Sequence, residues 1–246
     1  MKNYQAPENH LKDRVILVTG ASDGIGKAIA IAYAKAGATV ILHGRDIERL
    51  EKLYDEIVGQ GYPQPAMLPF DLNTTDEQEY RNLASVIAND LGRLDGIVHN
   101  AGVLEELTPI EHTSIKSWNK IMQVNLNSVF ALTKACLPLL KEAPSASIIT
   151  TSSGVGRQGR AFWGAYSTSK FAIEGFTQVL ADELEGTNIR ANCVNPGATL
   201  TKMRAIAFPA EDKSLLKTPE DIVPVYLYLM GDDSAEINGQ SISAQG

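Results

Sequence analysis

A nearly unbroken apolar run followed directly by a glycine-rich turn is the feature that most constrains the fold of this 246-residue chain. The run Arg14-Val-Ile-Leu-Val-Thr19 is typical of a parallel strand that helices cover on both faces. The turn Thr19-Gly-Ala-Ser-Asp-Gly-Ile-Gly26 comes next, and residues 24–37 carry apolar side chains at helical spacing. A strand, a glycine turn and a helix in this order predict the first unit of an open α/β sheet.

Strand-like and helix-like segments alternate along the rest of the chain. Further strands are predicted over 39–43, 66–70, 96–99, 147–152, 189–194 and 240–244. Further helices are predicted over 46–59, 75–91, 118–141 with a bend near Pro138, 165–185, and from Thr218 onward. The alternation predicts a single α/β domain over 1–246, built as a Rossmann-type doubly wound parallel sheet of about seven strands with helices on both faces.

Composition excludes several classes of function. The formal net charge of −7 argues against nucleic acid or an anionic membrane as the main partner. The polar N-terminal segment lacks the apolar core of a secretion signal, and no apolar stretch is long enough to span a membrane, so we expect a cytoplasmic protein. Cys136 and Cys193 lie in apolar runs and are predicted to be buried, reduced thiols. The four histidines lack the spacing of metal ligands, so no metal site is predicted.

The glycine turn predicts a phosphate-binding loop. Glycines let the backbone turn sharply and approach a pyrophosphate, while the N-terminus of the following helix offers free N–H groups. A P-loop for a nucleoside triphosphate is the alternative, because Gly26 precedes Lys27. That motif fails, since Ala21 stands where its first glycine should be and Ala28 where its serine or threonine should be. A dinucleotide is therefore the predicted ligand.

Tyr166 and Lys170 form a candidate catalytic pair. They are four residues apart in a predicted helix, so one helical turn places both side chains on the same face. A lysine ammonium beside a phenol favours the phenolate and lowers a tyrosine pKa that otherwise lies near ~10. Such a tyrosine can exchange a proton with a carbonyl oxygen at neutral pH. Ser153 supplies a further hydroxyl after the predicted strand that ends at residue 152. The pair alone is common on amphipathic helices, and the dinucleotide loop is what gives it weight.

Further short motifs follow over nearly the whole chain, namely Asp71-Leu72, Asn100-Ala101-Gly102, Asn125, Ser153, Tyr166, Lys170, Asn195-Pro196-Gly197 and Thr201. With the turn 19–26, and with Ser153 placed 13 residues before Tyr166, they resemble the single-domain short-chain dehydrogenase/reductase family. Two stretches, Gly-Arg-Gln-Gly-Arg-x-x-Trp-Gly-Ala-Tyr and Leu-Met-Gly-Asp-Asp-Ser, resemble more narrowly the bacterial YciK-like oxidoreductases. His99 departs from the family pattern, which often has a second asparagine there, and we interpret it as a change in strand packing.

The resemblance implies a role for each matching residue. Tyr166 would protonate a carbonyl oxygen, Ser153 would hold that oxygen, and Lys170 would lower the tyrosine pKa and hold the nicotinamide ribose. Asn125 would keep a water in place behind the lysine. Without the resemblance, the expected role of Asn125 is a helix-interior asparagine that is hydrogen-bonded to the backbone. Thr199 and Thr201 would face the nicotinamide carboxamide. The predicted cofactor-binding residues are Gly20, Ser22, Asp23, Gly24, Ile25, Gly26, Arg45, Asp71, Leu72, Asn100, Ala101, Gly102, Tyr166, Lys170, Pro196, Gly197, Thr199 and Thr201.

The end of the second predicted strand indicates which dinucleotide is bound. NAD sites usually place a carboxylate there, roughly 20 residues beyond the glycines, to bind the ribose diol. This chain has Gly44 followed by Arg45, and a guanidinium binds a 2′-phosphate in a charge-assisted fork. Asp46 and Asp23 could partly neutralise that charge. NADP(H) is therefore the preferred prediction, with NAD(H) left possible.

The substrate site is less defined by the sequence. Candidate wall residues are Leu104, Phe162, Trp163, Met203, Ile206 and Phe208. The long segment 202–217 lacks clear periodicity and is predicted to be a mobile lid. An apolar lining near Arg157, Arg160 and Arg204 would suit an apolar carbonyl compound, with or without an anionic group.

Three functions stay open on the sequence alone. The leading one is an NADP(H)-dependent reductase or dehydrogenase that acts on a small carbonyl or alcohol substrate with a Ser-Tyr-Lys-Asn set. The second is an NAD-dependent alcohol dehydrogenase, and the third is a non-catalytic dinucleotide sensor, which would not need Ser153, Tyr166 and Lys170 together. The predicted helices 118–141 and 165–185 resemble the family's dimer-forming pair, so a homodimer or homotetramer is expected.

Overall fold

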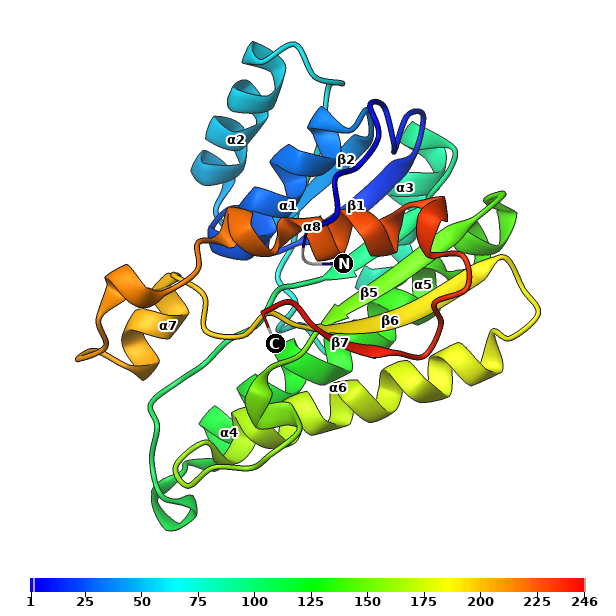
Figure 1. Ribbon diagram of the computed structural model, residues 1–246. Helices are drawn as coiled ribbons and strands as arrows, with labels where there is room; N and C mark the ends of the chain where they lie inside the picture. The colour runs from blue at the N-terminus through cyan, green and yellow to red at the C-terminus, as the bar shows by residue number, and fades with distance from the viewer. Residues whose placement is uncertain (2, 246) are drawn as a thin grey trace.

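Seven parallel strands form one sheet in the order β3-β2-β1-β4-β5-β6-β7 (Figure 1). The computed structural model describes Met1 and residues 3–245, so Lys2 and Gly246 of the predicted 1–246 domain lie outside the described residues. The strands are β1 (Val15–Thr19), β2 (Thr39–Gly44), β3 (Ala66–Pro69), β4 (Gly96–His99), β5 (Ala146–Thr151), β6 (Ile189–Asn195) and β7 (Ser241–Ser243). The strand order reverses between β1 and β4, which confirms the predicted doubly wound sheet.

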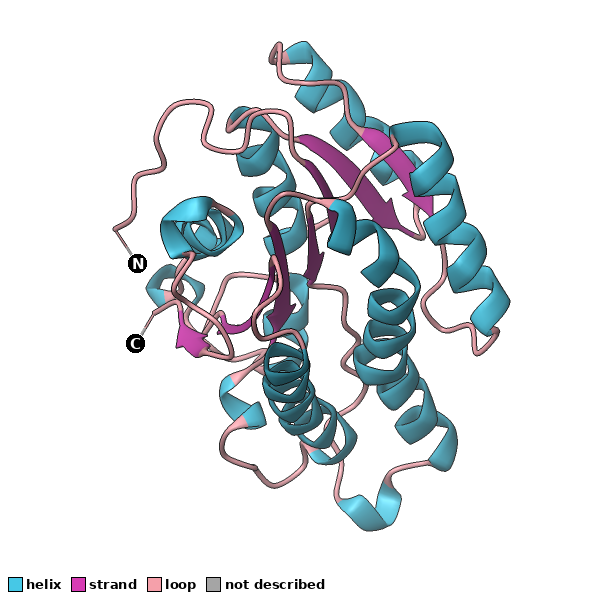
Figure 2. Cartoon of the chain, turned by 90° about the vertical axis from the view of Figure 1, so that its right-hand side faces the viewer, coloured by secondary structure: helices cyan, strands magenta, loops and turns pink. Residues whose placement is uncertain are grey.

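Helices cover both faces of the sheet (Figure 2). The helices are α1 (Gly24–Lys35), α2 (Ile47–Gly59), α3 (Glu77–Leu91), α4 (Ile115–Met122), α5 (Ser128–Glu142), α6 (Gly164–Glu183), α7 (Lys202–Ala207) and α8 (Pro219–Met230). One core packs α1, α2 and α8 against Ile16 and Val18 of β1, and the other packs α3, α5 and α6 against Val15 and Leu17. Successive side chains of a strand point to opposite faces, so the apolar run of β1 serves both cores.

The predicted helix over 118–141 differs from the observed structure. The helical segment begins earlier, at Ile115, where Ser114 caps α4 by accepting a hydrogen bond from the Ser117 amide. A π-helical segment, Gln123–Asn127, then separates α4 from α5, and α5 itself continues through Pro138. A π-turn holds more residues per turn than an α-helix and is often found at functional sites. The change of helix type in this segment therefore lies around Asn125, and the bend expected near Pro138 stays a prediction.

The two cysteines are buried and free, as predicted. Cys136 lies in α5 and Cys193 in β6, on separate elements of the fold. Burial raises the pKa of the Cys136 thiol to about 12 and that of the Cys193 thiol to about 11. Both side chains are therefore neutral, apolar parts of the interior at physiological pH.

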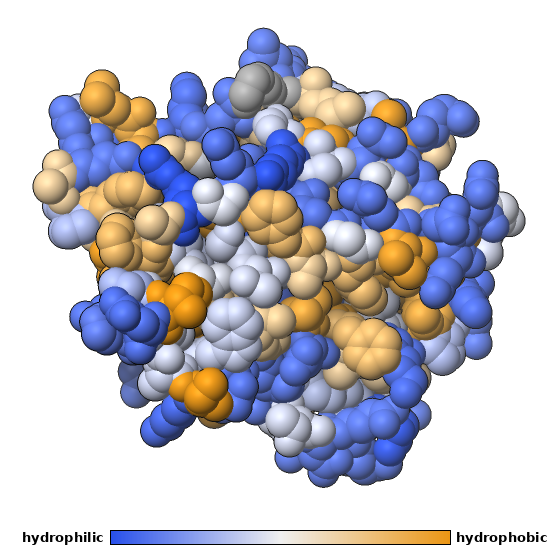
Figure 3. All heavy atoms as spheres, turned by 90° about the horizontal axis from the view of Figure 1, so that it is seen from below, coloured by the Kyte–Doolittle hydropathy of each residue, from blue (hydrophilic) through white to orange (hydrophobic). Residues whose placement is uncertain are grey.

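The outer surface on the side of α4 and α6 is mixed in character, with apolar residues at several places among hydrophilic ones (Figure 3). Along α5 and α6 the exposed apolar side chains are Phe130, Phe171 and Val179. The homodimer or homotetramer expected through these helices stays a prediction. Within the described part of the chain, no helix is long and apolar enough to cross a membrane.

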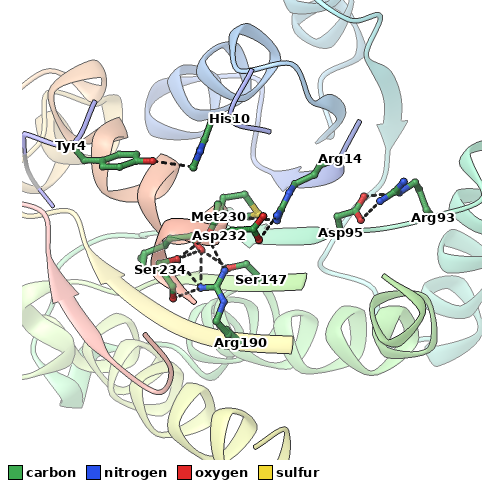
Figure 4. Close-up of polar contacts among 12 residues, drawn as sticks. Tyr4, His10, Arg14, Arg93, Asp95, Ser147, Arg190, Met230, Asp232 and Ser234 are labelled. Carbon is green, nitrogen blue, oxygen red and sulfur yellow. Dashed lines mark hydrogen bonds and ion pairs between the residues drawn. The ribbon is translucent and has the colours of Figure 1, made fainter. Parts of the chain in front are cut away.

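Two arginines bind the C-terminal end of α8 at the edge of the sheet where the strands begin (Figure 4). The buried Arg190 donates to the carbonyl oxygens of Leu229, Gly231 and Ser234 at 3.0–3.2 Å. Arg14 donates to the Met230 carbonyl at 3.0 Å. The last carbonyls of a helix lack helical partners and carry partial negative charge, so guanidinium groups stabilise them. This edge of the sheet is thereby fixed, whereas the site lies at the opposite edge.

We expect Arg190→Met to lower the free energy of unfolding by about 2–3 kcal/mol, because hydrogen bonds to a charged group are lost and carbonyls are left unpaired. Urea unfolding followed by circular dichroism measures the effect. Arg81→Met is the matched control, since Arg81 makes an exposed pair with Glu77, and it should cost roughly 0.5 kcal/mol or less. Equal small losses in both variants would contradict the anchoring role of Arg190.

Candidate active site

A cleft of about 290 Å³ opens at the carboxyl ends of β1, β4, β5 and β6, beside the point where the strand order reverses. Ligands of open α/β sheets bind at such a point. Most of the residues predicted from the sequence line it: Gly20, Asp23, Gly24, Ile25, Asn100, Ala101, Gly102, Leu104, Ser153, Trp163, Tyr166, Lys170, Pro196, Gly197, Thr199, Thr201 and Met203. Thr151 and Ser152 also line the cleft and were not predicted. Lys202, Arg204 and Ala207 line it from the predicted lid segment 202–217, and Arg204 was expected near the substrate.

The glycine turn forms one wall of the cleft in a conformation that depends on its glycines. Gly20 has φ of +67° and Gly24 has φ of +53°, a region that side chains disfavour. A Cβ atom on Gly26 would lie 2.2 Å from the Gly20 carbonyl oxygen and 2.6 Å from Nδ2 of Asn100. Asp23 caps α1 by accepting a hydrogen bond from the Gly24 amide at 2.8 Å. The turn therefore leads tightly into a helix N-terminus, the arrangement that binds phosphate groups.

Thr19 joins this turn to the loop after β4. Its Oγ1 accepts hydrogen bonds from the backbone N–H groups of Asn100 and Ala101, both at 3.0 Å. Asn100 returns a side-chain hydrogen bond to the Thr19 carbonyl oxygen at 3.1 Å. The preceding residue, His99, is buried and contacts Oγ1 of Thr133 in α5 at 2.9 Å, so it packs strand against helix and does not line the cleft.

Asn125 holds the same loop from the other side. Its Oδ1 accepts from the Val103 amide at 2.8 Å, and its Nδ2 donates to the Val103 carbonyl at 3.0 Å and to Oγ of Ser169 at 3.2 Å. The side chain is buried in the π-helical segment and lies outside the cleft lining. Its observed partners are thus largely backbone groups, and the water-holding role implied by the family resemblance stays a prediction.

Tyr166 and Lys170 lie one turn apart on α6 and point into the cleft together with Ser153. Burial raises the pKa of Tyr166 to about 12, although a hydrogen bond with Ser153 acts to lower it. Burial also lowers the pKa of Lys170 to about 8. The Lys170 Nζ lies 5.6 Å from the centre of the Tyr166 ring and donates a hydrogen bond of 2.7 Å to the Thr151 carbonyl.

Removal of the Tyr166 phenol from water outweighs the opposing hydrogen bond, so its pKa is raised overall. The lowering of the tyrosine pKa by Lys170 stays a prediction. Desolvation disfavours the charged form of each residue, so the phenolate and the ammonium both need stabilisation from neighbouring groups. The pair is sensitive to any charge that enters the cleft.

Five predicted cofactor residues lie outside the cleft lining: Ser22, Gly26, Arg45, Asp71 and Leu72. Arg45 and Asp71 are both exposed and 3.9 Å apart beyond the end of β2. Arg49, in the first turn of α2, pairs with Asp46 at 3.0 Å and with Asp23 at 3.4 Å. The sequence analysis did not single out Arg49, although this second arginine follows Arg45 by four residues.

The segment 202–217, predicted as a mobile lid, begins with α7, which lines one side of the cleft. Its mobility stays a prediction. Lys202 forms an ion pair with Asp23 of the glycine turn. Met203 places its sulfur 3.8 Å from the Tyr166 hydroxyl. Residues just after Thr201 therefore contact both the predicted cofactor loop and the predicted catalytic tyrosine.

Aromatic rings pack against one another beside the cleft and within the lid segment. Trp163 lies with its ring centre 5.7 Å from that of Tyr166 and 5.7 Å from that of Phe208. Arg204 stacks over the Phe208 ring at 3.9 Å and binds Glu211 through two hydrogen bonds of 2.5 and 2.7 Å. Phe208 thus supports the wall without lining it, and the Arg204 charge is balanced by Glu211.

The other predicted substrate residues, apart from Arg204, lie outside the cleft lining. Phe162 is mostly exposed, has φ of +74° and borders a small neighbouring depression instead of the cleft. Ile206 is also mostly exposed. Arg160 lies outside the cleft lining, and Arg157 turns away from it toward Glu174 and β7. Of the three arginines expected near the substrate, Arg204 is the one that lines the cleft.

The chain belongs to the short-chain dehydrogenase family. The model of that family, described as short chain dehydrogenase, matches residues 14–212. This confirms the family predicted from the motifs, and it identifies the chain as an oxidoreductase of a class with a Rossmann-like fold.

Bacterial relatives are similar over almost the whole chain. The uncharacterized oxidoreductase YciK of Escherichia coli K12 is 51% identical over 243 residues, which cover 99% of this chain and 96% of that protein. A short-chain dehydrogenase of Escherichia coli CFT073, crystallised with NADPH, is 51% identical, with a TM-score of 0.94 over 98% of this chain and 100% of that one. A Shigella flexneri 2a homologue crystallised with NADP is 50% identical, with a TM-score of 0.95 and the same coverage.

Proposed function

We propose that this oxidoreductase transfers a hydride between NADP(H) and a small carbonyl or alcohol substrate. The observation that carries the proposal is the convergence of Ser153, Tyr166 and Lys170 in one cleft with the glycine turn. The turn supplies a phosphate-binding loop, and the three side chains supply two hydroxyls and a buried ammonium beside it. The NADP and NADPH complexes of the two homologues support the choice of dinucleotide.

The residues present fit a bound dinucleotide. The missing Cβ atoms of Gly20 and Gly26 let the turn pack tightly against itself and the loop after β4. Gly24 and Ile25 at the start of α1 line the cleft, where the helix N-terminus would bind the pyrophosphate. Arg45 and Arg49, both half-exposed, would bind the 2′-phosphate through their guanidinium groups. We assign the adenine to Asp71 and Leu72, and the nicotinamide half to the remaining predicted residues Asn100, Ala101, Gly102, Lys170, Pro196, Gly197, Thr199 and Thr201.

The chemistry assigned to this chain is proton transfer and charge stabilisation. When bound, NADPH supplies the hydride. Tyr166 gives its phenolic proton to the carbonyl oxygen, and Ser153 donates a hydrogen bond to the same oxygen, where negative charge develops. Lys170 provides the positive charge that stabilises the phenolate left behind. Met203, next to the phenol, excludes water from the reacting oxygen.

We further propose that the substrate is an apolar carbonyl or alcohol compound without a charged group. Leu104, Trp163 and Met203 give the cleft near Tyr166 an apolar wall. Lys202 and Arg204 bring positive charge to the lining, but Asp23 and Glu211 pair with them. An anionic substrate would have to break one of these pairs, whereas a neutral substrate leaves both in place.

NAD-dependent alcohol oxidation is the second candidate function. Asp23 and Asp46 both pair with Arg49, and Asp71 lies near Arg45, so carboxylates partly balance the charge of the proposed 2′-phosphate site. A non-catalytic dinucleotide sensor has less support, because it would not need the serine, tyrosine and lysine in one cleft. Measuring which reduced cofactor the protein binds separates the first two functions.

Tyr166→Phe tests the proton donor. The substitution removes the phenolic oxygen and keeps the ring beside Trp163, so folding and NADPH binding should be retained. We expect turnover to fall by about 10²-fold or more, the scale of general acid–base catalysis. The loss of NADPH absorbance with a panel of apolar ketones, aldehydes and quinones measures it. Turnover within a few-fold of the wild type on any substrate of the panel would rule out Tyr166 as the acid.

Arg45→Ala tests the cofactor preference. Losing a hydrogen bond to a charged group costs roughly 1.5–3 kcal/mol, so NADPH binding should weaken about 10- to 100-fold. NADH has no 2′-phosphate, and its binding should stay nearly unchanged in the same variant. Adding Gly44→Asp supplies a carboxylate for the ribose diol and should reverse the preference. Dissociation constants are compared at fixed ionic strength. Equal affinity of the wild type for NADH and NADPH would show the NADP assignment to be wrong.

A further inference from the structure

Glu174 is an acidic side chain buried one helical turn beyond Lys170. Both residues lie on α6 and are buried, and their spacing of four places them on the same face of the helix. The Glu174 side chain is only 10% exposed. A buried carboxylate is costly unless a positive group or several hydrogen-bond donors balance it. Its position next to the site lysine therefore calls for an explanation.

Arg157 holds this carboxylate. Its Nε lies 3.3 Å from Oε1 of Glu174, and its Nη1 and Nη2 donate to the hydroxyls of Ser243 and Ser241 in β7 at 2.8 and 2.5 Å. Arg157 follows the short 3₁₀ segment Gly154–Gly156, which comes directly after Ser153. A Cβ on Gly156 would lie 2.9 Å from Cβ of Lys170, so this segment packs closely on the lysine. One guanidinium thus connects the serine segment, α6 and β7.

The groups around Lys170 leave Glu174 as its acidic neighbour. The Lys170 Nζ donates to the Thr151 carbonyl of β5, and the Tyr166 ring is the titratable group one turn earlier on α6. From β6, Cys193 faces it as a thiol, which burial keeps protonated with a pKa of about 11. Burial lowers the pKa of Lys170 to about 8, and Cys193 and Glu174 act against that change. Because the thiol is neutral at pH 8, Glu174 supplies the negative charge.

We propose that Glu174, held by Arg157, is a positioning residue that keeps the Lys170 ammonium charged inside the cleft. The consequence for catalysis rests on the proposed function, in which Lys170 must be protonated to stabilise the phenolate. Glu174 favours the ammonium, and Arg157 fixes where the carboxylate lies.

The first test needs no cofactor or substrate. The Lys170 pKa is measured by NMR of ¹⁵N-lysine-labelled protein, with the resonance assigned by its absence in Lys170→Met. Glu174→Gln should lower that pKa by about 1 pH unit, because an opposite charge near the ammonium is removed. Arg157→Met should lower it as well, because the carboxylate loses the guanidinium that holds it. Glu183→Gln, an exposed position on the same helix, is the control and should leave it unchanged. A Lys170 pKa unchanged in both Glu174→Gln and Arg157→Met would overturn the proposal.

The second test measures NADPH-dependent turnover against pH for the same variants. Lys170 carries its charge below its pKa, so the loss of activity on the alkaline side should begin at lower pH in both Glu174→Gln and Arg157→Met. A structural role alone would lower turnover without moving the profile. If the NMR pKa moves and the rate profile does not, the electrostatic link stands and the proposed function of Lys170 fails.

Discussion

Lys170 is an ammonium group that the fold has removed from water, and much of the site is arranged around that charge. Burial lowers its pKa to about 8, although neighbouring groups such as Glu174 act in the opposite direction. The Thr151 carbonyl accepts its hydrogen bond, and Glu174 lies one turn away on the same helix. The same burial raises the pKa of Tyr166 to about 12. The proton donor Tyr166 and the cation Lys170 are both removed from water. Their pKa values therefore respond strongly to any charge that enters the cleft.

The parallel sheet explains why such a site can form here. At the edge where strands begin, Arg14 and Arg190 bind the end of α8 and fix the packing of the helix on β5 and β6. At the opposite edge, the turn after β1 and the loop after β4 are joined through Thr19 and left open to solvent on one side. Gly26 has no Cβ atom, so the end of the turn packs directly against the Gly20 carbonyl group at its start. The strands thus hold these loops in defined positions, which is a common basis for ligand sites.

The sequence predicted the parts of this structure that depend on local pattern. Apolar runs and glycine turns predicted the strands and the doubly wound sheet, and the spacing of Tyr166 and Lys170 placed them correctly on one helix face. It did not predict the π-helical segment at Asn125, because helical periodicity continues on both sides of it. It also assigned Arg157 to the substrate region. That residue instead pairs with Glu174 and β7, contacts that arise only when distant segments meet. Arg204 was placed correctly, but its partner Glu211 was not foreseen.

The central claim is that the buried lysine controls the acidity of the tyrosine once a cofactor charge is present. The most direct test is the Tyr166 pKa, measured by NMR of ¹³C-tyrosine-labelled protein and assigned by comparison with Tyr166→Phe. We expect a pKa of about 12 without cofactor and a lower value in the presence of saturating NADP⁺, because the positively charged nicotinamide ring beside the phenol favours the phenolate. In Lys170→Met the pKa should stay higher than in the wild type at the same NADP⁺ saturation. An identical Tyr166 pKa in the wild type and in Lys170→Met would contradict this account.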